Sequence, residues 1–167
     1  KTAVLRGKEL AKDGYIAAIG IRPSKERNGY DYIIRDGEEI IDFVSRNEFE
    51  RAAKTYKDRE YLWNSGMYIY RVGDLINSVR KISPELFNTC RAAKRRVPAI
   101  RRGIRFSENV MRDIPPGSIE KVLFSDTDSL RVVEAEFEWQ DVGTVGDLDG
   151  LGSVTHSDYV IRNNCDD

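Results

Sequence analysis

The feature that most restricts the fold is a short and nearly continuous apolar run, YIAAIGI, at residues 15–21. Gly14 precedes the run and Pro23 follows it, so the run is short for a helix and is typical of a strand buried on both faces. Residues 2–11 carry apolar side chains at helical spacing, and Gly14 is expected to end that helix. A helix followed by a buried strand is the unit of an α/β sheet. The sequence therefore predicts an α/β fold.

A hairpin and a capped helix are predicted after this strand. Residues 30–35 and 40–44 are rich in β-branched and aromatic side chains, and the Asp-Gly pair between them is a strong hairpin signal. Asn47, with Glu50 three residues later, has the spacing of a capping box and predicts a helix that runs to about residue 56.

Turn residues and helix caps mark further elements downstream. The Asn64-Ser65-Gly66 stretch predicts a turn, and Pro84 is expected in the first position of a helix. Helices are predicted at residues 74–81, 84–96, 119–124 and 145–149, and strands at residues 67–70 and 130–137.

The charge balance and the apolar content limit the classes of protein. The chain has 27 Lys and Arg against 28 Asp and Glu, so no general attraction to nucleic acid or acidic membranes is expected. No apolar run approaches the roughly 18 residues of a membrane span. One local basic cluster is interpreted as a solvated helix face or a subunit contact, which leaves homo-oligomerisation open, rather than as a nucleic-acid site. Its members are Arg91, Lys94, Arg95, Arg96, Arg101, Arg102 and Arg105.

Cysteine and histidine usage argues against zinc and triad chemistry. Cys90 and Cys165 belong to no Cys-x-x-Cys pair, which leaves a zinc site without support and favours a reducing, cytoplasmic setting. His156 is the single histidine, so a Ser-His-Asp triad would depend on it alone.

Glycine loops that bind phosphate are absent from the sequence. Neither the GxGxxG pattern nor the P-loop pattern occurs, so the triphosphate of any nucleotide substrate is expected to bind outside this chain. The sequence begins at Lys1 with residues that already have helical spacing, so we expect a piece of a longer protein, with no catalytic residue in this piece.

Two short segments offer groups for binding a substrate or a metal. Asn64 and Ser65 carry donors and acceptors suited to sugar hydroxyls, although a turn of this composition also satisfies its own backbone. Asp141 follows a predicted strand end, where ligands bind in open α/β sheets, and one carboxylate with phosphate oxygens suits Mg²⁺. A structural cap is the alternative for Asp141.

Five segments, in this order, resemble those of the sugar nucleotidyltransferase family, and within it the mannose-1-phosphate guanylyltransferases. The most specific are the WNSGM and WQDVG stretches, with SIEK between them. The segments are GYIAAIGIRPSKERNGYDYI at residues 14–33, YLWNSGMYIYR at 61–71, PELFNTC at 84–90, SIEKVLF at 118–124 and WQDVGTVGDL at 139–148.

The resemblance implies a Rossmann-like, mixed and mostly parallel sheet with flanking helices. Residues 1–150 would form the sugar-phosphate half of the domain, and residues 151–167 a linker or the start of another domain. The implied reaction joins GTP and mannose 1-phosphate to give GDP-mannose and pyrophosphate, with Mg²⁺ as cofactor. The Gly-rich loop, the catalytic basic residues and the other metal-binding Asp would lie in the amino-terminal half of the parent protein.

Individual roles also follow from the resemblance. It implies that Asn64 contacts sugar hydroxyls, that Asp141 holds Mg²⁺, and that the backbone at Tyr30, Asp31 and Tyr32 lines the sugar.

Three positions depart from the family pattern. Asp31 stands where the family has glycine, and Ser45 and Arg46 stand where it has a Glu that binds sugar hydroxyls and a Lys that meets the phosphate. Arginine does not replace lysine conservatively at such a site, since its planar fork has a different reach. These departures favour an alternative function, a binding or regulatory module that has lost turnover.

Overall fold

A computed structural model describes residues 1–23, 29–95, 106, 108–123, 127–137 and 139–142. The chain divides into two compact units, Lys1–Phe137 and Glu138–Asp167, and the elements below belong to the first. The functional boundary expected at residue 150 stays a prediction, and the helix expected at residues 145–149 lies outside the described residues.

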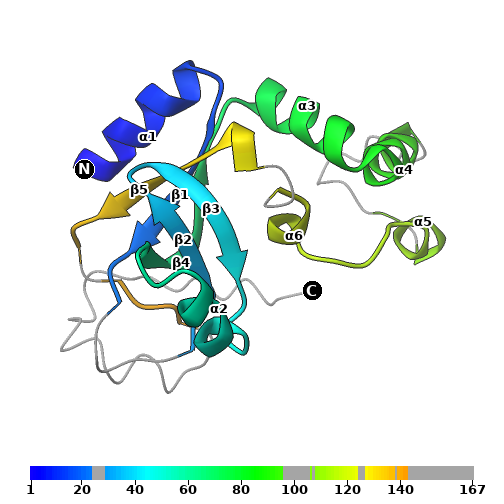
Figure 1. The fold of residues 1–167 in the computed structure, drawn as a ribbon. Helices are drawn as coiled ribbons and strands as arrows, with labels where there is room; N and C mark the ends of the chain where they lie inside the picture. Colours follow the sequence, from blue (N-terminus) through cyan, green and yellow to red (C-terminus); the bar gives the residue numbers. More distant parts are fainter. Residues whose placement is uncertain (24–28, 96–105, 107, 124–126, 138, 143–167) are drawn as a thin grey trace, which may run out of the picture. The chain divides into compact units, whose positions relative to one another are not determined.

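The described strands form a small closed barrel (Figure 1). In order around it they are β1 (Ile16–Ile21), β4 (Glu60–Ile69), β2 (Tyr32–Asp36), β3 (Glu39–Val44) and β5 (Leu130–Ala135). The closure between β3 and β5 is short: Glu39 pairs with Arg131, and the Val132 amide donates to the Glu38 carbonyl over 2.8 Å.

The α/β class and the mixed sheet are confirmed, but the expectation of a mostly parallel sheet is wrong for the described strands. Among them, β1 and β5 form the one parallel pair, while the other four pairings are antiparallel. The reason is local for β2 and β3, because the tight turn at Gly37, with φ of +59°, forces antiparallel neighbours. Parallel strands need a long crossover, and β1 and β5 are far apart in sequence.

Helix α1 (Thr2–Lys12) packs on the outside of the barrel against β1 and β5. Its buried face consists of Ala3, Gly7, Leu10 and Ala11, which confirms the predicted helix and the burial of Leu10 and Ala11, whereas the expected inward position of Leu5 is wrong because that side chain is exposed. Gly14 follows the C-cap with φ of +91°, so its predicted role in ending the helix is also confirmed.

Helix α2 (Phe49–Thr55) begins later than predicted. Its N-cap is Glu48, not Asn47, and no side chain caps its first turn, so the predicted capping box is wrong. The Glu48 amide donates to the Ser45 carbonyl over 2.9 Å, and this extra turn moves the helix start beyond Asn47.

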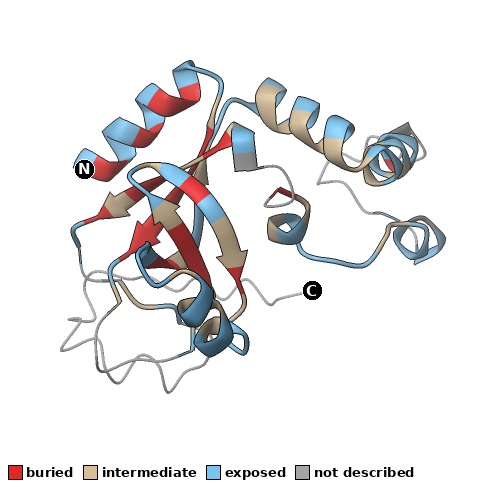
Figure 2. Cartoon of the chain, viewed as in Figure 1, coloured by how far each residue is buried: buried red, intermediate tan, exposed pale blue. Residues whose placement is uncertain are grey.

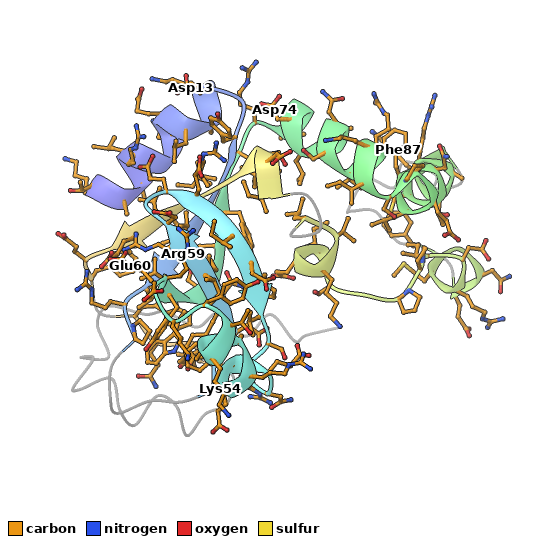
Figure 3. All side chains as sticks on the ribbon, in the orientation of Figure 1. Asp13, Lys54, Arg59, Glu60, Asp74 and Phe87 are labelled. Carbon is orange, nitrogen blue, oxygen red and sulfur yellow. The ribbon has the colours of Figure 1, made fainter. Side chains whose placement is uncertain are left out.

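The remaining described helices are short or amphipathic. They are α3 (Val72–Ile82), α4 (Pro84–Arg95), α5 (Glu108–Arg112) and α6 (Ile119–Leu123). Pro84 opens α4 as predicted, and the Arg80 guanidinium of α3 lies 4.7 Å from the ring centroid of Phe87 in α4 (Figure 3). Helix α5 was not expected from the sequence. No helix in the described ranges combines the length and the apolar character that a bilayer crossing requires.

The core lies inside the barrel, and Figure 2 shows the buried stretches of its strands in red. All six residues of β1 are buried, as the continuous apolar run predicts. Among the largest fully buried side chains are Ile16, Ile33, Leu130 and Val132, which come from three different strands.

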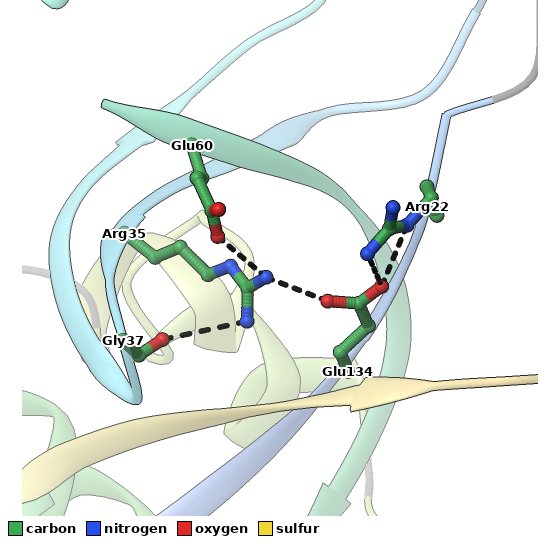
Figure 4. Close-up of polar contacts among 5 residues, drawn as sticks. All are labelled: Arg22, Arg35, Gly37, Glu60 and Glu134. Carbon is green, nitrogen blue, oxygen red and sulfur yellow. Dashed lines mark hydrogen bonds and ion pairs between the residues drawn. The ribbon is translucent and has the colours of Figure 1, made fainter. Parts of the chain in front are cut away.

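A cluster of ion pairs joins four strands or strand ends of the barrel (Figure 4). The Glu134 carboxylate accepts from Arg22 and from Arg35, each over 2.6 Å, and Arg35 also pairs with Glu60 over 2.7 Å. Burial alone would raise the pKa of Glu134, but the hydrogen bonds and charges of the two arginines outweigh it, so the pKa of this carboxyl lies below its ordinary value.

We expect Glu134→Gln to lower the free energy of unfolding by about 2 kcal/mol at neutral pH, because Arg35 is only 13% exposed and loses a charged acceptor. A carboxyl whose pKa is depressed in the folded state stabilises the fold above its ordinary pKa of 4.5 and loses that contribution as the pH falls. The deficit of the variant should therefore shrink below that pH. Denaturant unfolding of the unaltered protein and of Glu134→Gln, from neutral pH to below pH 4.5, measures this deficit. The control Glu9→Gln, which breaks an exposed pair with Lys12, should lower the free energy of unfolding by less than about 0.5 kcal/mol. A Glu134→Gln deficit that is as large in acid as at neutral pH would contradict the prediction.

Candidate functional site

The Asn64-Ser65-Gly66 stretch lies within strand β4 and is not the separate turn that the sequence predicts. The register between β1 and β4 shifts here: Ala18 pairs with Tyr68, but Gly20 pairs with Asn64. Residues 65–67 therefore bulge opposite Ile19, with Gly66 at φ of +72°. Turn-type residues thus mark a β-bulge, which interrupts regular pairing between Asn64 and Tyr68.

Ser65 fastens this bulge. Its hydroxyl donates to the Ile19 carbonyl over 2.6 Å and accepts from the Met67 amide over 3.2 Å. One contact is to the backbone of the segment itself, at Met67, and the other is to β1, so the Ser65 hydroxyl is used within the protein, although not only by its own turn.

Asn64 is held in one orientation. Its backbone amide donates to the Asp31 carbonyl over 2.8 Å, and its Oδ1 accepts from the Gly66 amide and from the Tyr68 hydroxyl, each over 3.2 Å. Burial raises the pKa of Tyr68, so its hydroxyl stays protonated and donates. With Oδ1 occupied, the Nδ2 group of Asn64 remains as a donor with no acceptor among the described residues.

Asp31 and Arg46 tie the start of β2 to the end of β3. The Asp31 carboxylate accepts from the Arg46 backbone amide over 3.0 Å, and the Arg46 guanidinium donates to the Gly29 carbonyl over 3.2 Å. The neighbouring Ser45 hydroxyl donates to the Glu48 carboxylate over 3.0 Å. The two substituted positions therefore bind different partners. The Arg46 side chain donates to the Gly29 carbonyl before β2, while the Ser45 side chain orients the Glu48 carboxylate.

A polar cavity of about 460 Å³ brings several of these groups together. Its lining consists of Asp31, Phe43, Ser45, Glu48, Asn64, Ser118, Glu120 and Lys121. A volume in this range is typical of small-molecule sites. Three residues predicted as substrate-binding, namely Asp31, Ser45 and Asn64, thus share one cavity although they come from separate segments.

The other predicted substrate-binding residues do not line this cavity with their side chains. The Tyr32 ring stacks on Phe49 with a centroid separation of 3.7 Å and is 7% exposed, and the Tyr30 ring lies 5.1 Å from that of Trp63. Both aromatic rings are thus engaged in packing, and the suggested role of their backbone stays a prediction.

Sequence reasoning missed four polar residues of the cavity. Ser118, Glu120 and Lys121 belong to the SIEK segment, which the sequence marks as a motif without giving its side chains a role. The Ser118 hydroxyl accepts from the Lys121 amide over 3.4 Å, which confirms its predicted position at the start of α6. Glu48 carried no signal of its own, since it becomes part of the site only through its contact with Ser45.

Asp141 belongs to the second unit, and its side chain is exposed. Its role as a Mg²⁺ ligand and its relation to the cavity stay predictions. Within the part of the chain that the structure describes, no group of three His, Cys, Asp or Glu residues is arranged to hold a metal ion. Because Mg²⁺ takes one or two carboxylates together with phosphate oxygens and water, Asp141 stays a candidate ligand.

A second cavity, of about 580 Å³, lies between α3, α4 and the segment before α6. Its lining is mainly apolar, with Leu75, Val79, Leu86 and Ile119 among its residues, so it offers few groups that would orient a sugar. Within the basic cluster predicted from the sequence, Arg91 and Lys94 are exposed on α4, and residues 96, 101, 102 and 105 lie outside the described ranges.

Comparison with curated proteins gives matches along nearly the whole chain. A mannose-1-phosphate guanylyltransferase from Salmonella typhimurium is 27% identical over 166 residues, which are 96% of this chain and 35% of that protein. A putative mannose-1-phosphate guanylyltransferase from Vibrio cholerae is 28% identical, over 99% of this chain and 38% of that protein. The chain thus spans little more than a third of the length of these curated relatives.

Two solved structures share the fold of this chain, and a family model matches most of its length. A structure titled mannose-6-phosphate isomerase, from Helicobacter pylori, superimposes with a TM-score of 0.74 at 23% identity, over 84% of this chain and 57% of that one. One titled mannose-1-phosphate geranyltransferase, from Thermus thermophilus, gives 0.65 at 24% identity, over 85% and 41%. These two similarities concern the fold alone. The model of the family described as Nucleotidyl transferase matches residues 1–152. The chain therefore belongs to the nucleotidyl transferase family.

Proposed function

We propose that the full-length protein transfers GMP from GTP to mannose 1-phosphate, giving GDP-mannose and pyrophosphate, and that this chain holds the sugar phosphate. The observation that carries the proposal is the shared cavity of Asp31, Ser45 and Asn64, three residues that the family resemblance marks as candidates for binding. Curated relatives named mannose-1-phosphate guanylyltransferase support the choice of nucleotide and sugar.

In the proposed reaction, an oxygen of the sugar phosphate attacks the α-phosphorus of GTP, and pyrophosphate leaves with the electron pair of the broken bond. Such transfers depend on positioning and on offsetting the negative charge that builds up on the phosphates. This chain would orient the sugar through the Asn64 amide and the carboxylates of the cavity, and Asp141 would hold Mg²⁺, which supplies positive charge when bound. The chain lacks a Gly-rich phosphate loop, so residues 1–167 alone are expected to bind sugar phosphate without turnover.

The expected setting is the cytoplasm, with no nucleic-acid or membrane partner. The exposed, free Cys90 thiol agrees with a reducing compartment, and the near-neutral charge gives no general attraction to polyanions. Homo-oligomerisation remains open.

The test is an assay of pyrophosphate release by the full-length protein with GTP, Mg²⁺ and a panel of sugar 1-phosphates. We expect release with mannose 1-phosphate and a loss of at least about 100-fold in Asp141→Ala, which corresponds to about 2.7 kcal/mol of transition-state stabilisation. Asp58→Ala, at another exposed aspartate outside the cavity, should leave the rate unchanged. No release with any sugar from folded protein would end this proposal.

The alternative is a binding or regulatory module without turnover. It is favoured by the Asp31 carboxylate, which lines the cavity at a position where the family has glycine, and by the loss of the family's Glu-Lys pair at Ser45 and Arg46. It predicts a folded full-length protein that binds a nucleotide sugar and releases no pyrophosphate. Robust release that is lost in Asp141→Ala would rule it out.

A further inference from the structure

Some charged groups of the polar cavity already have partners in the protein, and others have none among the described residues. The Asp31 carboxylate accepts from the Arg46 amide, and the Glu48 carboxylate accepts from Ser45. The side chains of Glu120 and Lys121, by contrast, form no ion pair or hydrogen bond with any residue that the structure describes. Lys121 is also the single cationic side chain among the described lining residues of this cavity.

We infer that Glu48 and Lys121 divide the recognition of the ligand: Glu48, oriented by Ser45, binds hydroxyl groups of a hexose, and Lys121 binds its phosphate. This inference rests on the proposed function and names the residues that carry it out in this chain, at positions other than the substituted Ser45 and Arg46. The ligand class is an aldohexose 1-phosphate.

The case for Glu48 begins with its fixed position. A turn holds its backbone, since the Glu48 amide donates to the Ser45 carbonyl over 2.9 Å, and two contacts hold its carboxylate, with Ser45 over 3.0 Å and Arg51 over 3.3 Å. A carboxylate offers about four acceptor sites, so about two remain for a ligand. Ser45, which is too short to replace the family's Glu directly, thus places a carboxylate three residues further along the chain.

Asn64 complements this acceptor. Its Nδ2 group is a donor without a partner in the described part of the chain, and both Asn64 and Glu48 line the cavity. A sugar hydroxyl both donates and accepts, so an amide donor and a carboxylate acceptor on one cavity suit adjacent hydroxyls. The Glu48 carboxylate would repel a phosphate group but can accept from sugar hydroxyls, so it suits the sugar ring and not the phosphate.

The phosphate requires a cation, which Lys121 offers. Its ammonium group is a compact charge with three donors and binds phosphate oxygens strongly because the hydrogen bonds are charge-assisted. Glu120 is the next residue on α6, and its side chain leaves the helix about 100° away, so the two need not face the same ligand group. The cavity lining thus includes both a carboxylate, at Glu48, and an ammonium group, at Lys121, and a ligand that carries hydroxyls and a phosphate requires both kinds of group.

The test measures the affinity of the full-length protein for two ligands, α-mannose 1-phosphate and methyl α-mannoside, by calorimetry or NMR titration. Glu48→Gln should weaken both ligands about tenfold, because the lost acceptor serves the sugar. Lys121→Met should weaken mannose 1-phosphate about tenfold and leave methyl mannoside unchanged, since only the former carries phosphate. Thermal unfolding of each variant checks that the fold is intact.

Matched controls are available on α2. Glu50→Gln and Lys54→Met remove the same charges at exposed positions outside the cavity and should leave both affinities unchanged; Figure 3 labels Lys54. If Glu48→Gln binds both ligands as tightly as the unaltered protein, this inference is wrong and the proposed function still stands. The same holds if Lys121→Met loses affinity equally for both ligands. If the unaltered protein binds neither ligand, both the proposed function and this inference are wrong.

Discussion

Replacing Gly20 by valine is expected to lower the free energy of unfolding by about 3 kcal/mol or more, because β1 has no room for a side chain at this position. A Cβ atom built on Gly20 would lie 2.5 Å from Leu62 Cδ1, 2.9 Å from Leu62 Cβ and 3.0 Å from Val132 Cγ2. The tip of Leu62 can rotate, but its Cβ moves only with the backbone of β4, so the strands must separate. Since Gly20 pairs with Asn64 across these strands, the same displacement would disturb the cavity.

Denaturant unfolding of Gly20→Val and of Gly73→Ala measures this effect. A Cβ at Gly73 in α3 meets no atom within 4 Å, so Gly73→Ala should stabilise the protein by about 0.5–1 kcal/mol through the lower entropy of the unfolded chain. A Gly20→Val protein as stable as the unaltered one would show that β1 and β4 approach less closely than described.

Truncation of Leu130 to alanine is the second large effect, with an expected loss of about 2–5 kcal/mol. Leu130 is fully buried in the core and pairs with Ile16 at the start of the parallel β1–β5 ladder. The truncation removes apolar contacts and leaves a cavity that the surrounding strands fill only in part. A loss of this size is a large fraction of the stability of a typical domain.

The matched control for this truncation is Leu5→Ala, the same substitution at a helix position that is 52% exposed. It should change the free energy of unfolding by less than about 0.5 kcal/mol. Similar losses at Leu130 and Leu5 in denaturant unfolding would contradict the assignment of Leu130 to the core.

Elements whose ends are defined by local chemistry were predicted well. Every residue of β1 is apolar or glycine, so its burial on both faces follows from the sequence alone. Gly14 and Gly37 adopt positive φ values that few other residues tolerate, Pro84 fixes its own φ, and each lies at the boundary expected for it. The ends of β2, β3 and β5 shift by a residue or two, but β4 begins at Glu60, seven residues before the predicted start.

Predictions failed where one local pattern fits two structures. Asn64-Ser65-Gly66 suits a turn and a bulge equally, and pairing with β1 decides for the bulge. Asn47 has the spacing of a cap, but the turn from Ser45 to Glu48 uses the backbone groups first. The preference for parallel strands came from the resemblance, and apart from the hairpin turn at Gly37 no local signal in the sequence indicates the direction of the paired strands.

The amino-acid sequence by itself determined the α/β class, the buried first strand, the hairpin and Asn64 as a candidate for binding, while Asp31 and Ser45 became candidates through the family resemblance. Only the tertiary structure decided which strands pair and in which direction, and that Glu48 and Lys121 join the same cavity. The physical reason is that side-chain periodicity and turn chemistry act over a few residues, whereas strand order and cavity lining depend on contacts between segments far apart in the chain.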